Sequence, residues 1–151
     1  MTTEAQSAHD MTTLTVSTED TISQIGYSLS NIPSYELSNV VISGHALKLI
    51  GERIKSFGIE LDQILPISKA GLYRQYKKED IDLPLKDNLV GITQLLNRGT
   101  AAFESREDFQ DWLASRIENM GNCRPLDSLS LQTGRREVEQ ALERIEYSVY
   151  G

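Results

Sequence analysis

Apolar residues recur at intervals of three and four along the chain from Ser43 onward, and this periodicity constrains the fold more than any other feature. It is the spacing at which side chains share one face of an α-helix. The first such face is followed by Gly58, a residue type that commonly ends helices. Shorter helices are predicted over residues 60–65, which Pro66 follows, and over 69–78. The predicted fold class is therefore all-α. The first face consists of Leu47, Ile50, Ile54 and Phe57.

The two short segments over 60–65 and 69–78 are joined by a tight turn, and the second is basic. This is the outline of a helix-turn-helix, whose second helix enters the major groove of DNA. Its basic side chains would contact phosphates and base edges. The acidic residues that follow oppose DNA binding, and the alternative is a helical scaffold that serves dimerisation and assembly. The predicted DNA contacts are Lys69, Tyr73, Arg74, Lys77 and Lys78.

The longest predicted helix opens at Leu83-Pro84 and carries an apolar seam in steps of four and three residues. A seam with this spacing is suited to packing against another helix. A small residue within it allows close approach of the two helices. The sequence leaves open whether the second helix belongs to a second copy of the chain or to the same chain. The seam predicted for dimerisation consists of Leu85, Leu89, Ile92, Leu96, Gly99 and Phe103.

The C-terminal third contains two further amphipathic patterns. The first follows a capping box at Ser105-Arg106-Glu107-Asp108 and runs to a stop at Gly121-Asn122. The second starts after Thr133, a predicted N-cap, and ends in an apolar, aromatic stretch. That stretch is expected to be buried in the chain's own core, against a symmetry mate or against a partner. The face residues are Phe109, Trp112, Leu113 and Ile117, then Val138, Leu142, Ile145 and Val149, with Leu126, Leu129 and Leu131 as predicted core anchors between them.

The N-terminal part is acidic and less regular. Residues 1–42 hold five acidic residues and no Lys or Arg, within a formal net charge of −7 for the whole chain. A capping box at Ser17-Thr18-Glu19-Asp20 precedes a weak helical pattern, Ile22, Ile25 and Leu29. Residues 40–42 are β-branched and predict either a short N-terminal strand or a buried lead-in to the next helix. Residues 1–38 are therefore predicted to form an acidic, partly disordered arm.

Several function classes have no support in the sequence. The two histidines, His9 and His45, have no partners at catalytic or metal-ligand spacing, and Cys123 is the one cysteine. No phosphate-binding loop, nucleophile motif or signal peptide is present. The chain is predicted to be a cytoplasmic protein without enzymatic activity, cofactor or metal. The acids Glu137, Glu139, Glu143 and Glu146 are expected on a solvated helix face, with Arg135, Arg136 and Arg144 as their partners.

A family resemblance accounts for the C-terminal pattern. Trp112-Leu113, Pro125-Leu126-Asp127-Ser128-Leu129, Thr133-Gly134 and the run from Arg144 to Gly151 resemble the toxin-binding domain of Xre/MbcA/ParS antitoxins. Ser148 stands where that family commonly has Gly. The resemblance covers roughly residues 100–151, and more loosely the helix-turn-helix before it. It implies an Xre-like helix-turn-helix and dimerisation region over 39–104, followed by a small helical toxin-binding domain over 105–151.

The resemblance also implies a function. Antitoxins of this family are encoded beside RES-domain toxins, which degrade NAD, and they cover the toxin's active site with their C-terminal region. The chain is accordingly predicted to be the antitoxin of a type II toxin–antitoxin pair, a homo-oligomer that autoregulates its operon by binding operator DNA. The alternative is a stand-alone helix-turn-helix transcription regulator without a toxin. The predicted toxin contacts are Trp112, Arg144, Glu146, Tyr147, Val149, Tyr150 and Gly151.

Overall fold

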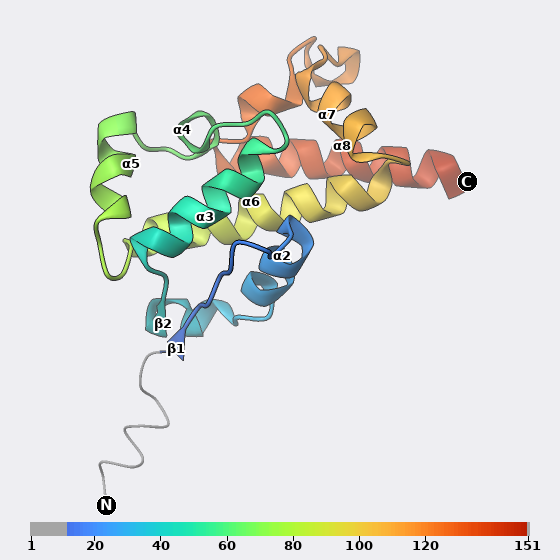
Figure 1. Ribbon diagram of the computed structural model, residues 1–151. Coiled ribbons are helices and arrows are strands. Elements are labelled where there is room, and N and C mark those ends of the chain that lie inside the picture. The colour runs from blue at the N-terminus through green and yellow to red at the C-terminus, as the bar shows by residue number, and fades with distance from the viewer. Residues whose placement is uncertain (1–11, 151) are drawn as a thin grey trace, which may run out of the picture.

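The computed structural model describes residues 12–150, without the side chains of residues 149 and 150, and its regular secondary structure is helical apart from two very short strands (Figure 1). This confirms the predicted all-α class. None of the described helices is both long and apolar enough to cross a membrane. The elements are β1 (Thr12–Thr13), α2 (Ile22–Ser30), the 3-10 helix η1 (Ser34–Asn39), β2 (Val40–Val41), α3 (Gly44–Lys55), α4 (Leu61–Ile64), α5 (Lys69–Tyr76), α6 (Leu83–Ala102), α7 (Arg106–Ala114), the 3-10 helices η2 (Glu118–Met120) and η3 (Pro125–Ser128), and α8 (Gln132–Tyr150).

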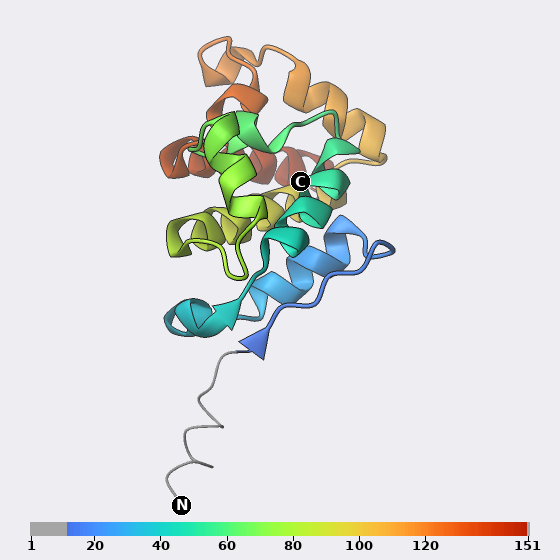
Figure 2. The same ribbon diagram turned by 60° about the vertical axis from the view of Figure 1, so that its left-hand side comes forward.

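Helix α6 is the centre of the molecule, because α2 and α8 both pack along it (Figures 1 and 2). Its apolar seam is covered by helices of the same chain, including α7 at its C-terminal end. Leu85, Leu89, Ile92 and Leu96 are each at most 6% exposed in a single chain. Their burial leaves no apolar seam for a second copy. The structure therefore corrects the predicted role of the seam in dimerisation and shows the intramolecular alternative.

Gly99, predicted to allow close approach of a second α6, instead makes room for an aromatic ring of the same chain. A Cβ placed on Gly99 would lie 2.0 Å from Cζ of Phe109. Phe109 is completely buried, and its ring centroid lies 5.6 Å from that of Phe103 and 6.2 Å from that of Phe57. Trp112 packs against two of these rings. Its ring centroid lies 5.7 Å from that of Phe103 and 6.4 Å from that of Phe109. We call these four side chains the aromatic cluster.

One hydrophobic core runs through the described chain, from Ile22 to Leu142. It includes Ile22, Ile25 and Leu29 from α2, so residues 12–38 contribute a packed helix rather than the predicted arm. It also joins α6 to α7 and α8 across the predicted boundary between residues 104 and 105. Residues 1–11, the rest of the predicted arm, lie outside the described range.

The short strands pair in parallel, Thr12 with Val40 and Thr13 with Val41. This decides between the two structures predicted for residues 40–42 and favours the strand. Two parallel strands cannot be joined by a tight turn and need a long crossover connection. Here α2 and η1 provide it.

N-cap residues in the sequence correctly predicted where several of the helices begin. The side chains of Ser43, Ser68 and Ser105 each accept a hydrogen bond from a backbone N–H of the first turn, as N-caps do. Gly58 has a φ of +75°, the left-handed conformation of a helix stop. Three predicted boundaries are wrong. The cap of α2 is the pair Thr21 and Gln24 rather than Ser17–Asp20, α7 ends at Ala114 well before Gly121, and α8 begins at Gln132, so Thr133 lies inside it.

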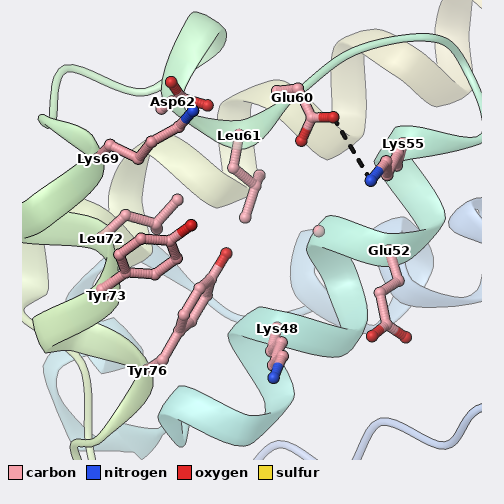
Figure 3. Close-up of a pocket in the computed structure, with 11 residues that line it drawn as sticks. Lys48, Glu52, Lys55, Glu60, Leu61, Asp62, Lys69, Leu72, Tyr73 and Tyr76 are labelled. Carbon is pink, nitrogen blue, oxygen red and sulfur yellow. Dashed lines mark ion pairs between the residues drawn. The ribbon is translucent and has the colours of Figure 1, made fainter.

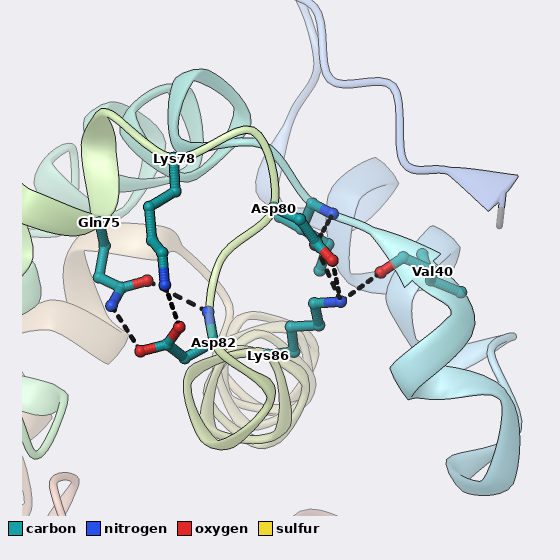
Figure 4. Close-up of polar contacts among 7 residues, drawn as sticks. Val40, Gln75, Lys78, Asp80, Asp82 and Lys86 are labelled. Atoms are coloured by element: carbon teal, nitrogen blue, oxygen red, sulfur yellow. Dashed lines mark hydrogen bonds and ion pairs between the residues drawn. The ribbon is translucent and has the colours of Figure 1, made fainter.

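A buried lysine ties the start of α6 to β2 (Figure 4). Lys86 is 2% exposed, and its Nζ donates to the carbonyl oxygen of Val40 at 2.6 Å and lies 2.9 Å from Oδ1 of Asp80. The same carboxylate oxygen accepts from the backbone N–H of Ile42 at 3.0 Å. A buried ammonium is tolerated because a carboxylate and a carbonyl replace its water. This contact fixes the loop that follows α5.

Candidate functional site

Most of the predicted toxin-binding residues lie at the C-terminal end of α8, where the helix becomes exposed. Val138 and Leu142 on this helix are completely buried, whereas Ile145 and Glu146 are half-buried and Tyr147 is 75% exposed. Figure 1 shows this end of α8 at the edge of the molecule, past the end of α6. Tyr147 therefore does not fold back onto the chain's own core. Gly151 and the side chains of Val149 and Tyr150, which complete the predicted set, lie outside the described part.

Glu146, one of the predicted toxin contacts, has a partner within the chain. Nε of Arg98 on α6 lies 3.3 Å from Oε1 of Glu146, and its Nη2 lies 3.2 Å from Oε1 of Glu143. Burial lowers the pKa of Arg98, but the two carboxylates outweigh it and the net pKa is raised. One guanidinium thus holds two successive turns of α8 against α6. This corrects the predicted partners of Glu143 and Glu146, because Arg98 binds them in place of the arginines on α8. The predicted contact of Glu146 with a toxin stays a prediction.

A groove lies on another flank of α8, between this helix and the segment after α7. Its volume is about 160 Å³, and its lining is mostly apolar. Trp112, predicted to contact the toxin, forms part of its wall, and Arg144 is exposed at its rim. Arg144 makes no ion pair or hydrogen bond with any other described side chain. The complete lining is Trp112, Ile117, Asn119, Ala141, Arg144, Ile145 and Ser148.

The start of α8 is fixed by Arg135, whose role the sequence did not reveal. Arg135 is 7% exposed, although it was predicted as a surface partner for glutamates. Its Nη1 donates to the carbonyl oxygen of Leu129 at 2.8 Å and its Nη2 to Oδ1 of Asn88 at 2.9 Å. Burial lowers the pKa of this guanidinium. The adjacent Gly134 allows the tight approach, since a Cβ there would lie 2.0 Å from the carbonyl oxygen of Ser128.

Residues 98–147 match the family model of the antitoxin Xre/MbcA/ParS C-terminal toxin-binding domain. No curated protein matches the chain. The matched range begins at Arg98, the residue that binds Glu143 and Glu146, and contains α7 and most of α8. It confirms the resemblance for the C-terminal part of the chain. A toxin-binding domain implies a toxin partner, and the α8 end and the groove beside it lie in or directly after that domain.

The predicted DNA-binding residues lie before the toxin-binding domain, on and just after α5. Lys69, Tyr73, Arg74 and Lys77 are exposed, whereas Gly71, Leu72 and Gln75 on the opposite face are buried. The fifth predicted residue, Lys78, has its ammonium paired with the carboxylate of Asp82 (Figure 4). Asp82 also exchanges hydrogen bonds with Gln75, and these contacts lower its pKa. Four of the five residues therefore remain on one open surface.

A second groove, of about 250 Å³, separates α5 from α3 (Figure 3). Tyr73 and Tyr76 line it from α5, with ring centroids 5.9 Å apart. Lysines and acids alternate around it, and Lys55 pairs with Glu60 at 3.6 Å. The pKa of Tyr76 is raised by burial, and further by Tyr73 and the acids Glu60, Asp62 and Glu52. Three lysines and three acids line this groove, so it offers no net positive charge to a polyanion.

No group of three or more His, Cys, Asp or Glu side chains within residues 12–150 is placed to hold a metal ion. The arrangement of the C-terminal residues instead favours binding to a protein surface. It combines an aromatic side chain and an arginine on a rigid helix, the residue types that dominate protein interfaces.

Proposed function

We propose that this protein is the antitoxin of a type II toxin–antitoxin pair and neutralises a RES-domain, NAD-degrading toxin by covering its active site with the C-terminal region. The observation that carries the proposal is the toxin-binding-domain match over residues 98–147, which falls on the helices whose exposed end presents Arg144 and Tyr147. The choice of a RES-domain toxin rests on the residue resemblance in the closing run, from Arg144 to Gly151. The pair acts in the cytoplasm.

The geometry of α8 supports this role. Arg98 and the core hold the helix up to Glu146, so the residues beyond that point are presented on a preformed support. A binding element that is already ordered loses less conformational entropy when it binds. The proposed contacts are Trp112, Arg144, Glu146, Tyr147, Val149, Tyr150 and Gly151, and Glu146 also supports α8 through Arg98.

The proposal is tested by an NAD-depletion assay with the purified toxin encoded next to this protein's gene. We expect NAD loss to stop when the full-length protein is added at or slightly above the molar amount of toxin. The protein alone should leave NAD unchanged. Continued NAD loss at a large molar excess would show that this chain does not neutralise that toxin.

We also propose operator binding by α5, favoured by the exposed strip of Lys69, Tyr73, Arg74 and Lys77. Two half-sites about one helical turn apart require a homodimer. Because the α6 seam is buried, the dimer interface must lie elsewhere on the surface. The alternative function, a transcription regulator without a toxin, would use the same strip, and the absence of a toxin gene beside this one would favour it.

The salt dependence of binding to the protein's own promoter tests this second activity. Each phosphate contact contributes about −0.9 to the slope of log K against log [salt]. Replacing Arg74 or Lys77 by alanine is expected to make the slope shallower by about 1 per protomer. Lys78→Ala is the matched control, because that ammonium already pairs with Asp82, and its slope should equal the wild-type value. A wild-type slope near zero would rule out phosphate contacts by α5.

A further inference from the structure

The groove beside α8 is too small for a free cofactor or a drug-sized ligand. Its volume of about 160 Å³ lies below the range of roughly 300–1,000 Å³ that is typical of small-molecule sites. It has the size of a socket for one side chain of a partner. Its apolar lining, from Trp112, Ile117, Ala141 and Ile145, favours an apolar side chain as the occupant.

The charge of the groove adds a second requirement. Arg144 is the one charged residue in the lining, and no acidic side chain accompanies it. The nearby carboxylates of Glu143 and Glu146 are bound to Arg98 on another flank of α8. An exposed guanidinium at the rim of an apolar socket is complementary to a carboxylate, which it can bind through two parallel hydrogen bonds.

Both walls of the groove are preformed. Trp112 is held by Phe103 and Phe109 of the aromatic cluster. Ile117 is held by an antiparallel bridge to Cys123, in which its N–H donates to the Cys123 carbonyl oxygen at 3.0 Å. The lining is contained in the matched toxin-binding domain, except for Ser148, which follows it directly.

From these observations we infer that the groove receives a segment of the toxin in which an apolar side chain lies next to an aspartate or glutamate. The apolar side chain fills the socket between Trp112 and Ile145, and the carboxylate binds Arg144. This inference rests on the proposed function and adds to it. The end of α8 covers the toxin's active site, while the groove binds an acidic surface segment beside that site.

The inference is tested by the affinity of the full-length protein for the toxin, measured by titration calorimetry. Arg144→Glu places a carboxylate opposite the toxin's carboxylate, so we expect affinity to fall by about 100-fold or more. Ile117→Gln, which puts a polar group into the socket, is expected to weaken binding about tenfold. Arg136→Glu, an equal charge change on an exposed position of α8 two turns earlier, should stay within about threefold of wild type. Circular dichroism and the melting temperature establish that each variant is folded.

The outcomes separate the two proposals. If Arg144→Glu and Ile117→Gln bind the toxin like wild type, the groove inference is overturned and the proposed function stands. If Arg136→Glu weakens binding as much as Arg144→Glu, the effect is a general attraction between charged surfaces, and the groove inference also fails. If the wild-type protein neither binds nor inhibits the toxin, it is the proposed function that fails. Recovery of Arg144→Glu binding by an Asp→Arg or Glu→Arg change on the toxin would identify the acidic segment directly.

Discussion

A chain that ends at Glu146 is expected to lose toxin neutralisation almost completely while it keeps its fold. The truncation removes Tyr147, which is 75% exposed, and the residues after it, so no core side chain is lost from the described part. Leu142 and the pairs of Arg98 with Glu143 and Glu146 remain. A few hot-spot residues dominate most interfaces, Tyr is enriched among them, and truncating one costs about 2 kcal/mol or more. We therefore expect at least about a 100-fold excess of truncated over full-length protein for equal inhibition in the NAD-depletion assay.

Two controls define this experiment. The melting temperature of the truncated protein should lie within a few degrees of the wild-type value, because the buried stripe of α8 is intact. Tyr27→Ala is the matched side-chain control for Tyr147→Ala, since Tyr27 is 70% exposed and lies on α2, outside the toxin-binding domain. Tyr147→Ala is expected to weaken inhibition and Tyr27→Ala to leave it unchanged. Full inhibition by the truncated chain would show that the end of α8 does not cover the toxin's active site.

Replacing Phe109 by alanine is expected to lower the free energy of unfolding by about 3–5 kcal/mol, the usual effect of deleting a fully buried Phe side chain. Phe109 has no exposed surface and lies between Gly99 on α6, Phe57 after α3 and Trp112 on α7. Its contacts therefore join the region before residue 105 to the region after it. Since small domains are stabilised by about 5–15 kcal/mol in total, a large part of the stability is lost. Urea unfolding measures the effect.

The same experiment tests whether the chain unfolds as one unit. Trp112 is the single tryptophan, so its fluorescence reports on the toxin-binding domain, while far-ultraviolet circular dichroism reports on all helices. With one shared core, the two transitions should coincide in wild type. Gly99→Ala forces a methyl group into the Phe109 ring and should cost about 1–3 kcal/mol, less the roughly 1 kcal/mol that alanine adds to helix stability. In a Phe109→Ala background the Gly99→Ala cost should disappear, as the ring is absent. Separate transitions for the two probes would show that the two regions unfold independently.

The candidate sites were only partly predictable. The sequence placed Trp112, Arg144 and Tyr147 in one binding region, and these three lie at the groove and the exposed end of α8. It did not reveal the pairing of Glu146 with Arg98, because a glutamate on a helix face carries no mark of a partner 48 residues earlier. It likewise gave no sign that Lys78 pairs with Asp82 while Lys77 stays free on the surface of α5.

By itself, the sequence determined where most of the helices lie and which class of partner the C-terminal part is related to. Those features depend on short-range chemistry. Caps such as Ser43 and Ser105 satisfy backbone N–H groups three residues away, and apolar spacing of three and four residues defines a helix face. The closing run carries the family's residues in consecutive order.

Tertiary structure alone decided which faces meet. The α6 seam could have packed on a second chain, but α2 and α8 of the same chain cover it, and Gly99 receives Phe109. Arg135 became a buried link from α8 to Leu129 and Asn88, although its neighbours in sequence suggested a solvated position. Such pairings depend on the geometry of a whole core. Helical periodicity shows that a face must be buried, and it does not specify what covers that face.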